Sequence, residues 1–421
     1  MKKSLVALAA LAATTAFAQS SVTLYGNMDQ SVFRSSADAG WMLSSNSNGG
    51  STSLWGITGK EDLGGGTTVS FDLKSELSLA TGSTGSSSTG VSSSSTVQNK
   101  DKDGTLNGTY TTSDYSVPMF NRGAWVGIAN KSLGDFKIGR QNDAWWETGT
   151  QFNNTGINSF GWANATAAVS GTAASQLAAL SAGKGLSVPA YADADATKAT
   201  TGSANQTWVG YAGGSNPASR GTGMAFYGGI SYATPVINGF QFKFGNGVPK
   251  AGYATHTETN NLRTYSLNYK NGPLTAAWAT TNTNFGNESG IKNTLIGVKY
   301  VMGQYTFTAA QNQTRLGTAV LAAAAHDADV RAFGVGYAMN AKWNLDVGYT
   351  TTSDKIDTAN KFTQTGVTAK YAFSKRTTWY VGYGKGKNEG VANYGTVYAG
   401  GDAPGKGLST TAIITGLRHQ F

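Results

Sequence analysis

The feature that most constrains the fold is an alternation of apolar and polar residues with a period of two. It is clearest in residues 409–421, where Ile413, Leu417 and Phe421 fall on one face of an extended chain and Arg418 falls on the other. One face is therefore apolar and the other polar or small. We expect this segment, which ends on an aromatic carboxyl terminus, to pair with the first strand and close a sheet into a barrel.

The same alternation recurs along most of the chain. Apolar residues alternate with Gly, Thr, Asn, Asp, Gln and Lys in residues 22–29, 54–60, 69–77, 240–244, 296–300, 333–337, 343–349 and 367–373. Counting such segments gives about sixteen strands, an even number that fits a single-chain barrel. The sequence therefore predicts an all-β fold, a 16-stranded antiparallel transmembrane β-barrel with a wet interior. A soluble sandwich, the alternative, would not need this many strands in one domain.

The first residues have the parts of a secretory signal. Lys2 and Lys3 precede an apolar run over residues 5–13, and Ala16-Phe17-Ala18 resembles a cleavage site. We expect cleavage after Ala18, so that residues 1–18 are a signal peptide and residues 19–421 form one barrel domain. The apolar run is too short for a transmembrane helix, which needs about 20 residues.

Short and long connections alternate between the expected strands. Short turns are expected at residues 131–134, 235–239, 271–273, 302–303, 340–342 and 374–376, and polar stretches lie near residues 249–260, 284–291, 316–328, 355–360 and 388–408. This asymmetry is typical of outer-membrane barrels, which have short periplasmic turns and long outside loops. Residues 80–116, rich in Ser, Thr and Gly, are expected to be an exposed loop or a partly disordered one.

One connection, about residues 142–222, is much longer than the others. A connection of this length in a compact domain is either functional or disordered, and Trp145, Trp146, Trp162 and other aromatic residues argue against disorder. Its Ala-rich part, residues 163–182, is expected to contain a short helix. The alternatives left open are a loop folded into the barrel lumen and a large extracellular cap.

Charge and composition exclude several functions. The formal net charge is +9, but the basic residues form no stripe and no nucleic-acid-binding module is visible. The chain has no cysteine, and His256, His326 and His419 lie in different segments without a carboxylate pattern. We therefore expect no cofactor, no metal site and no hydrolase constellation.

Several short segments together resemble the trimeric general porins of the Neisseria, Comamonas and Burkholderia type. The resemblance rests on residues 21–26 with Asp29, 59–66, 120–122 with Ala124, Val126 and Gly127, 138–141, 230–232 with Pro235, 239–240, 371–377, and 416–419 with Phe421. It covers nearly the whole mature chain. It implies a homotrimer of sixteen-stranded barrels in the outer membrane, each with a third loop folded into its lumen.

The resemblance also suggests site residues. In the family, basic side chains on the barrel wall face the third loop at the narrowest point, and Arg122 and Arg220 match two of them. Leu54 stands where the family often has arginine, while Lys74 adds a positive charge where an acid is common. The expected constriction residues are Arg122, Arg220, Arg140, Lys74, Asp143, Glu147, Trp145 and Trp146, with Asp143 and Glu147 supplying the opposing charge. For Arg140, an ion-paired wall residue is an equally good interpretation.

These observations predict a water-filled channel for passive diffusion of ions and small hydrophilic solutes, with a mild anion preference. The alternatives are a substrate-specific channel that uses the aromatic third loop, and an outer-membrane enzyme or adhesin. Expected partners are outer-membrane lipid, lipopolysaccharide, and the barrel-assembly machinery, for which Phe421 would be part of the recognition signal.

Overall fold

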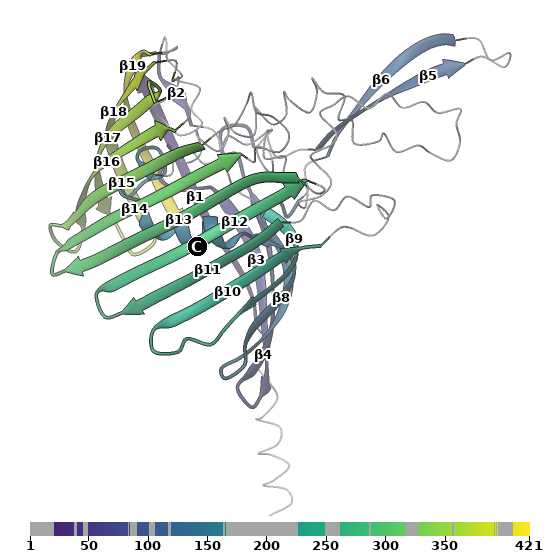
Figure 1. Ribbon diagram of the computed structural model, residues 1–421, viewed down its shortest axis with the longest axis horizontal. Coiled ribbons are helices and arrows are strands. Elements are labelled where there is room, and N and C mark those ends of the chain that lie inside the picture. Colours follow the sequence, from purple (N-terminus) through teal and green to yellow (C-terminus); the bar gives the residue numbers. More distant parts are fainter. Residues whose placement is uncertain are drawn as a thin grey trace, which may run out of the picture.

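A computed structural model of the chain describes residues 21–37, 40–44, 49–82, 84, 91–100, 106–116, 119–162, 165, 226–248, 262–285, 288–316, 327–355, 358–390, 392, 394 and 407–421. One antiparallel sheet curls into a barrel (Figure 1). Its long strands are β1 (Ser21–Ser35), β3 (Leu54–Gly64), β4 (Thr67–Glu76), β7 (Gly123–Asn130), β8 (Gly134–Asn142), β9 (Phe226–Ala233), β10 (Phe240–Gly247), β11 (Leu262–Asn271), β12 (Leu274–Phe285), β13 (Glu288–Met302), β14 (Tyr305–Leu316), β15 (Asp327–Ala338), β16 (Trp343–Asp354), β17 (Lys361–Ala372), β18 (Thr377–Glu389) and β19 (Ser409–Gln420).

The sheet closes on itself. Strand β1 pairs with β19 from Asn27↔Gln420 to Ser35↔Ala412, and its first half pairs with β3. The short β2 (Met42–Leu43) adds two residues beside β1. After β19, Phe421 exchanges two backbone hydrogen bonds of 3.1 Å with Gly26. The closed barrel of sixteen long strands is confirmed, as is the pairing of the last strand with the first.

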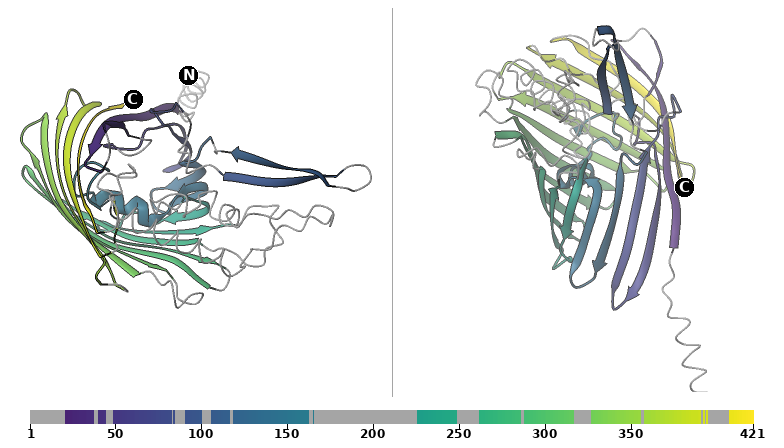
Figure 2. Two further views of the ribbon diagram at one scale, coloured as in Figure 1. Left: turned by 90° about the horizontal axis from the view of Figure 1, so that it is seen from above. Right: turned by 90° about the vertical axis from the view of Figure 1, so that its right-hand side faces the viewer.

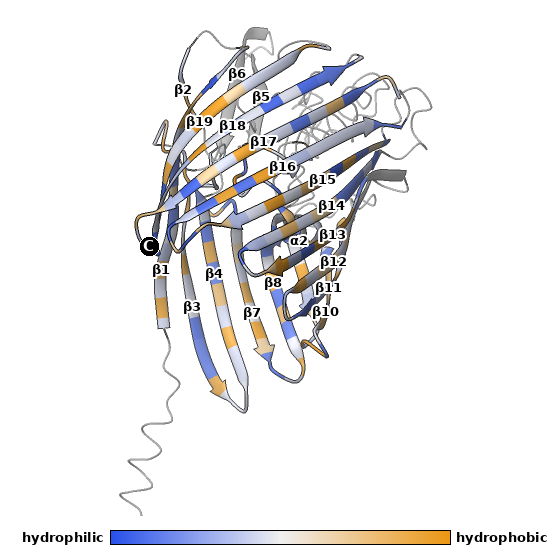
Figure 3. Cartoon of the chain, turned by 90° about the vertical axis from the view of Figure 1, so that its left-hand side faces the viewer, coloured by the Kyte–Doolittle hydropathy of each residue, from blue (hydrophilic) through white to orange (hydrophobic). Residues whose placement is uncertain are grey.

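The two faces of the sheet differ as the sequence pattern predicts. Large apolar side chains project from the outer face, and Val126, Ile296 and Leu417 are each 49–62% exposed. Thr, Ser, Asn and Gln alternate with them on the inner face, and the apolar positions recur along each strand in Figure 3. In lipid the outer side chains are covered, and closure leaves no unpaired sheet edge. No helix among the described residues has the length and apolarity needed to cross a membrane.

Aromatic side chains gather where strands meet the short turns. Phe240 packs on Tyr269 with ring centroids 4.4 Å apart, Tyr305 on Tyr337 at 4.9 Å, and Trp343 on Tyr371 at 4.9 Å. These rings bridge neighbouring strands at one end of the barrel. Amphipathic rings favour the membrane–water interface, so this end of the barrel carries an aromatic girdle.

Residues 80–116, expected to be an exposed or partly disordered loop, contain a strand pair that the sequence pattern does not predict. Strands β5 (Val91–Lys100) and β6 (Leu106–Ser116) pair in a separate two-stranded sheet that projects from the barrel in Figure 1. The sequence pattern missed this hairpin because Ser and Thr, rather than large apolar residues, occupy most of its positions. Threonine has a high strand propensity, but it produces no alternation of apolar and polar residues.

Candidate channel constriction

The chain turns into the barrel directly after β8. Asp143 ends the strand and caps α2 (Ala144–Gly149), accepting a hydrogen bond of 2.7 Å from the Trp146 backbone N–H. The short helix η2 (Thr150–Phe152) follows. Seen from above in Figure 2, these helices lie inside the ring of strands. In the described part of the loop, residues 143–162 and 165, the chain thus lies inside the ring of strands.

Tryptophan side chains anchor α2 to the inner wall. Trp145 is fully buried, and its Nε1 donates to Asn312 Oδ1 on β14 at 2.6 Å. Trp162 lies 6.2 Å from both Trp145 and Trp146, centroid to centroid. The wall beneath is apolar, although it faces the lumen. The side chains of this cluster are Trp145, Phe152, Trp162, Ala165, Ala277, Ala279, Leu295, Ala310, Ala328, Val330 and Ala332.

Beyond α2 the loop crosses a row of glycines. Directly paired positions on three neighbouring strands, β15 to β17, are occupied by Gly334, Gly348 and Gly366, and a Cβ atom on each would meet the loop. A Cβ atom added to Gly348 would lie 2.6 Å from Thr155 Cγ2 and 2.8 Å from the Asn154 carbonyl oxygen. Real Cβ atoms do not approach other atoms so closely. The absence of side chains therefore lets the loop backbone rest directly on the sheet. We call this row the glycine track.

Asn154 fastens the loop to the glycine track. Its Nδ2 donates to Phe333 O at 3.0 Å, Tyr349 O at 3.3 Å and Thr350 Oγ1 at 3.1 Å. Its Oδ1 accepts from the Trp162 backbone N–H at 2.8 Å. The residue is only 3% exposed, so a substitution that removed these bonds would leave buried polar groups unsatisfied.

The far end of this segment docks at the seam between the first and last strands. Ile157 and Phe160 pack with Phe33, Tyr380, Ala412 and Ile414. Asn158 N–H donates to Gly50 O at 3.2 Å, and the Gly50 N–H donates to the Tyr380 hydroxyl at 2.7 Å. The loop is therefore held on both sides of the lumen by wall residues from β11 to β19 and β1.

The wall opposite carries Arg122, which precedes β7. Its Nε and Nη2 both lie 2.7 Å from Glu76 Oε2, and the two side chains are 7% and 2% exposed. Arg122 thus forms a buried ion pair with the end of β4. The charges of the two side chains largely cancel, so Arg122 presents little net charge to the lumen.

Arg140 lies beside this pair. Its Nε donates to the Asn121 carbonyl at 2.7 Å, and it pairs opposite Ala124. Side chains alternate between the two faces of a strand, so Arg140 shares a face with Ile138, which is 52% exposed on the outer face, and not with Lys137, which faces the lumen. The position of Arg140 favours the wall-residue interpretation over a place on the channel path.

Lys74 does face the lumen. Lys74 Nζ lies 3.4 Å from Asp72 Oδ2, and the Tyr25 hydroxyl donates a hydrogen bond to the same carboxylate group. Lys74 pairs across the strands with Gly56, which lies beside Tyr25. The lysine side chain is 30% exposed. Leu54 lies two positions along the same face of β3, half-buried opposite Asn27.

The two loop carboxylates play different parts. Glu147 is half-exposed and its Oε1 lies 2.7 Å from Lys243 Nζ on β10. Asp143 is fully buried, and burial raises the pKa of its carboxyl to about 7, opposed by the hydrogen bond from Trp146 N–H. Glu147 can therefore meet a passing ion, whereas Asp143 holds the start of α2.

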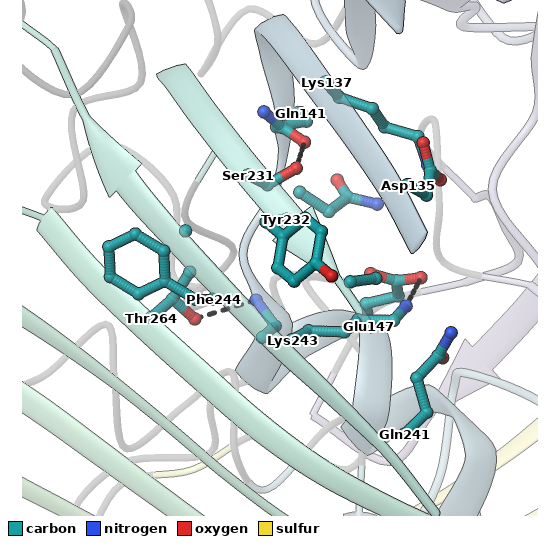
Figure 4. Close-up of a pocket in the computed structure, with 14 residues that line it drawn as sticks. Asp135, Lys137, Gln141, Glu147, Ser231, Tyr232, Gln241, Lys243, Phe244 and Thr264 are labelled. Carbon is teal, nitrogen blue, oxygen red and sulfur yellow. Dashed lines mark hydrogen bonds and ion pairs between the residues drawn. The ribbon is translucent and has the colours of Figure 1, made fainter. Parts of the chain in front are cut away.

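A cavity of about 130 Å³ lies between α2 and the wall formed by β8 to β11. Figure 4 shows the Lys243–Glu147 ion pair and the hydrogen bond from Ser231 Oγ to Gln141 Oε1 on its lining. Asp135 and Lys137, 2.9 Å apart, complete its charged side. The cavity is polar and open, as expected of a space continuous with a wet lumen. No group of three metal-ligating side chains occurs among the described residues.

The structure places Arg122 and Lys74 on one wall, with Arg140 beside Arg122 but off the channel path. Helix α2, with Trp145, Trp146 and Glu147, lies against another part of the wall. Arg220 falls outside the described residues, as do His256, His326 and most of the expected helix over residues 163–182. Sequence reasoning missed Glu76, Asn154 and the glycine track. The available signal was a glycine on the polar face of each of three strands, but the alternation by itself indicates only a small residue facing the lumen.

Comparisons with known proteins identify the family of the chain. Residues 4–391 match the family of Gram-negative porins. Outer membrane porin protein 32 of Delftia acidovorans is 49% identical over 80 residues, 18% of this chain and 23% of that protein. The chain therefore matches under a quarter of this relative's length.

Solved structures share the fold. An anion-selective porin from Comamonas acidovorans superposes with a TM-score of 0.66 at 20% identity, over 96% of this chain and all of that chain. OmpT of Vibrio cholerae gives 0.56 at 13% identity, over 96% and 98%. The channel DcaP of Acinetobacter baumannii gives 0.51 at 10%, over 96% and 97%. With a family match over most of its length and a closed sixteen-stranded barrel, the chain belongs to the Gram-negative porins, outer-membrane channels rather than enzymes.

Proposed function

We propose that the chain forms a water-filled channel for passive diffusion of ions and small hydrophilic solutes, with a mild preference for anions. The observation that carries this proposal is the docked third loop, which crosses a polar lumen inside a closed barrel. A loop so held narrows the channel, and charged side chains on both sides of the opening act on whatever passes. The anion preference is supported by the excess of basic residues and by the fold shared with an anion-selective porin.

The preference should be weak because most lumen charges are paired. Arg122 is balanced by Glu76, Lys74 by Asp72 and Lys243 by Glu147. At about 8 Å a unit charge contributes around 2 kcal/mol at an effective dielectric of 20, and 0.1 M salt reduces this further. No single residue can then impose strict selectivity.

A substrate-specific channel remains the second candidate, since Trp145, Trp146 and Trp162 form a cluster in the loop. Trp145 and Trp162 are fully buried against the wall and only Trp146 is partly exposed. Such a cluster supports packing of the loop better than an aromatic path for a solute.

We also propose a homotrimer in the outer membrane, contacts with lipopolysaccharide, and recognition of Phe421 by the barrel-assembly machinery. A signal peptide over residues 1–18 would deliver the chain to that machinery. Cross-linking in native outer membranes tests the trimer. Reversal potentials across planar bilayers under a KCl gradient test selectivity: we expect a small potential of the sign that marks chloride preference, and a cation-selective potential would contradict the proposal.

A further inference from the structure

The inner wall of the barrel carries lysines that differ in their surroundings. Four have a carboxylate within 4.0 Å: Lys74 with Asp72, Lys137 with Asp135, Lys243 with Glu147, and Lys370 with Asp346. Lys270 on β11 and Lys299 on β13 have no such partner among the carboxylates that the structure describes. Their charges are therefore not balanced locally.

The register places these two lysines side by side on the lumen face. Lys270 pairs with Thr275 on β12, and Thr275 pairs on its other side with Lys299. Two strand spacings separate their backbones by about 10 Å, and flexible lysine side chains can span that distance to hold one small anion. The Lys270 charge acts repulsively on Lys299, as expected of two cations sharing one region.

The pair of lysines lies next to the docked loop. Lys299 Nζ donates to the Gln151 carbonyl in η2 at 3.3 Å, so its ammonium group lies at the edge of the docked loop. Lys270 is exposed and precedes the turn at residues 271–273. An ion crossing the lumen on this side of the loop passes both ammonium groups.

We propose that Lys270 and Lys299 form an uncompensated positive site on the described wall that gives the channel its anion preference and attracts small anions, divalent ones most strongly. The proposal rests on the channel function above and assigns its selectivity to this wall rather than to Arg122. The field of two fixed charges is focused by the low-dielectric barrel wall and acts on ions of opposite sign.

The test compares charge-changing with charge-neutral variants under a KCl gradient. The Lys270→Gln/Lys299→Gln double variant should lower the chloride-over-potassium permeability ratio by about two-fold at 0.1 M salt, and by less at 1 M. The Lys270→Arg/Lys299→Arg variant should keep the wild-type ratio. The charge-neutral control Lys370→Gln/Asp346→Asn, which removes a paired lysine together with its carboxylate, should also keep it.

Sulfate provides an independent readout. Added to a chloride solution, it should reduce the wild-type chloride current more than that of the double glutamine variant. An unchanged permeability ratio and unchanged sulfate effect in a variant with normal conductance would overturn the assignment. A wild-type channel without chloride preference would contradict the proposed selectivity. The assignment to Lys270 and Lys299 would still be tested, because it depends on the change in permeability ratio between wild type and the double glutamine variant. A wild type that does not conduct would overturn both.

Discussion

The glycine track makes a specific demand on residue 348. In the Gly348→Ala variant the new methyl group would lie 2.6–2.8 Å from Thr155 Cγ2, Asn154 Nδ2 and the Asn154 carbonyl oxygen. The sheet itself should tolerate the change, because alanine fits a strand at least as well as glycine. The loop, and not the barrel, must therefore move.

The cost can be worked from the contacts that the movement would break. Asn154 Nδ2 shares its two protons among three acceptors on β15 and β16, and each of the two donated hydrogen bonds contributes about 0.5–1.5 kcal/mol net. Losing both bonds disfavours the docked position by about 1–3 kcal/mol, which shifts the balance between docked and displaced loops by roughly 5- to 150-fold. We expect a wider or noisier channel.

Single-channel recording and exclusion of graded polyethylene glycols measure this directly. The Gly348→Ala channel should admit larger polymers and conduct more than wild type. Gly123→Ala is the matched control, since a Cβ at Gly123, near Lys74 on the other wall, meets only ordinary contacts of 3.5 Å or more. Equal conductance, noise and polymer cutoff in both variants would refute the idea that the loop rests on the glycine track.

Three other predictions follow from single contacts. The pKa of Asp143 is raised to about 7 in the folded protein, so between about pH 4 and 7 the folded protein holds a proton that the unfolded chain has lost. Stability should therefore fall as pH rises through this range and then level off. The Asp143→Asn variant, which keeps the cap, should flatten this part of a profile of melting temperature against pH, and an unchanged slope would contradict the prediction. The Arg122→Gln variant should lower the yield of folded barrel on heat-modifiability gels, because breaking a buried ion pair costs about 3–5 kcal/mol. Adding Glu76→Gln should restore the yield, and equal yields of wild type and Arg122→Gln would show that the pair is dispensable. Deleting Phe421, which bonds to Gly26, should reduce heat-modifiable trimer, while Phe421→Tyr should not; a wild-type level after deletion would disprove the assembly role.

The barrel was predictable because the interactions that specify it are between residues close together in the sequence. A period-two pattern fixes which face of each strand meets lipid, and the short turns fix how neighbouring strands pair. Residues 413–417 already show this in one strand, since Ile413 and Leu417 are exposed on the outer face and Ile414 is buried on the inner face.

The constriction was less predictable because it depends on contacts between distant segments. Arg122 and Glu76 are 46 positions apart, and Asn154 reaches strands nearly 200 positions away. A sequence pattern shows a charged residue but not its partner. Arg122 is therefore predicted to be an unpaired cation in the lumen, although Glu76 neutralises its charge. Asp143 likewise reads as a lumen acid, whereas its place at the start of α2 buries it.

The central claim is that the chain is a passive, water-filled channel narrowed by its docked loop. Single-channel conductance of the purified protein in planar bilayers, measured from 0.1 to 3 M KCl, tests it most directly. A passive wet channel should show conductance that rises nearly linearly with salt concentration. Saturation at low salt, or block by one sugar at micromolar concentration, would contradict the claim and favour a specific binding site in the channel.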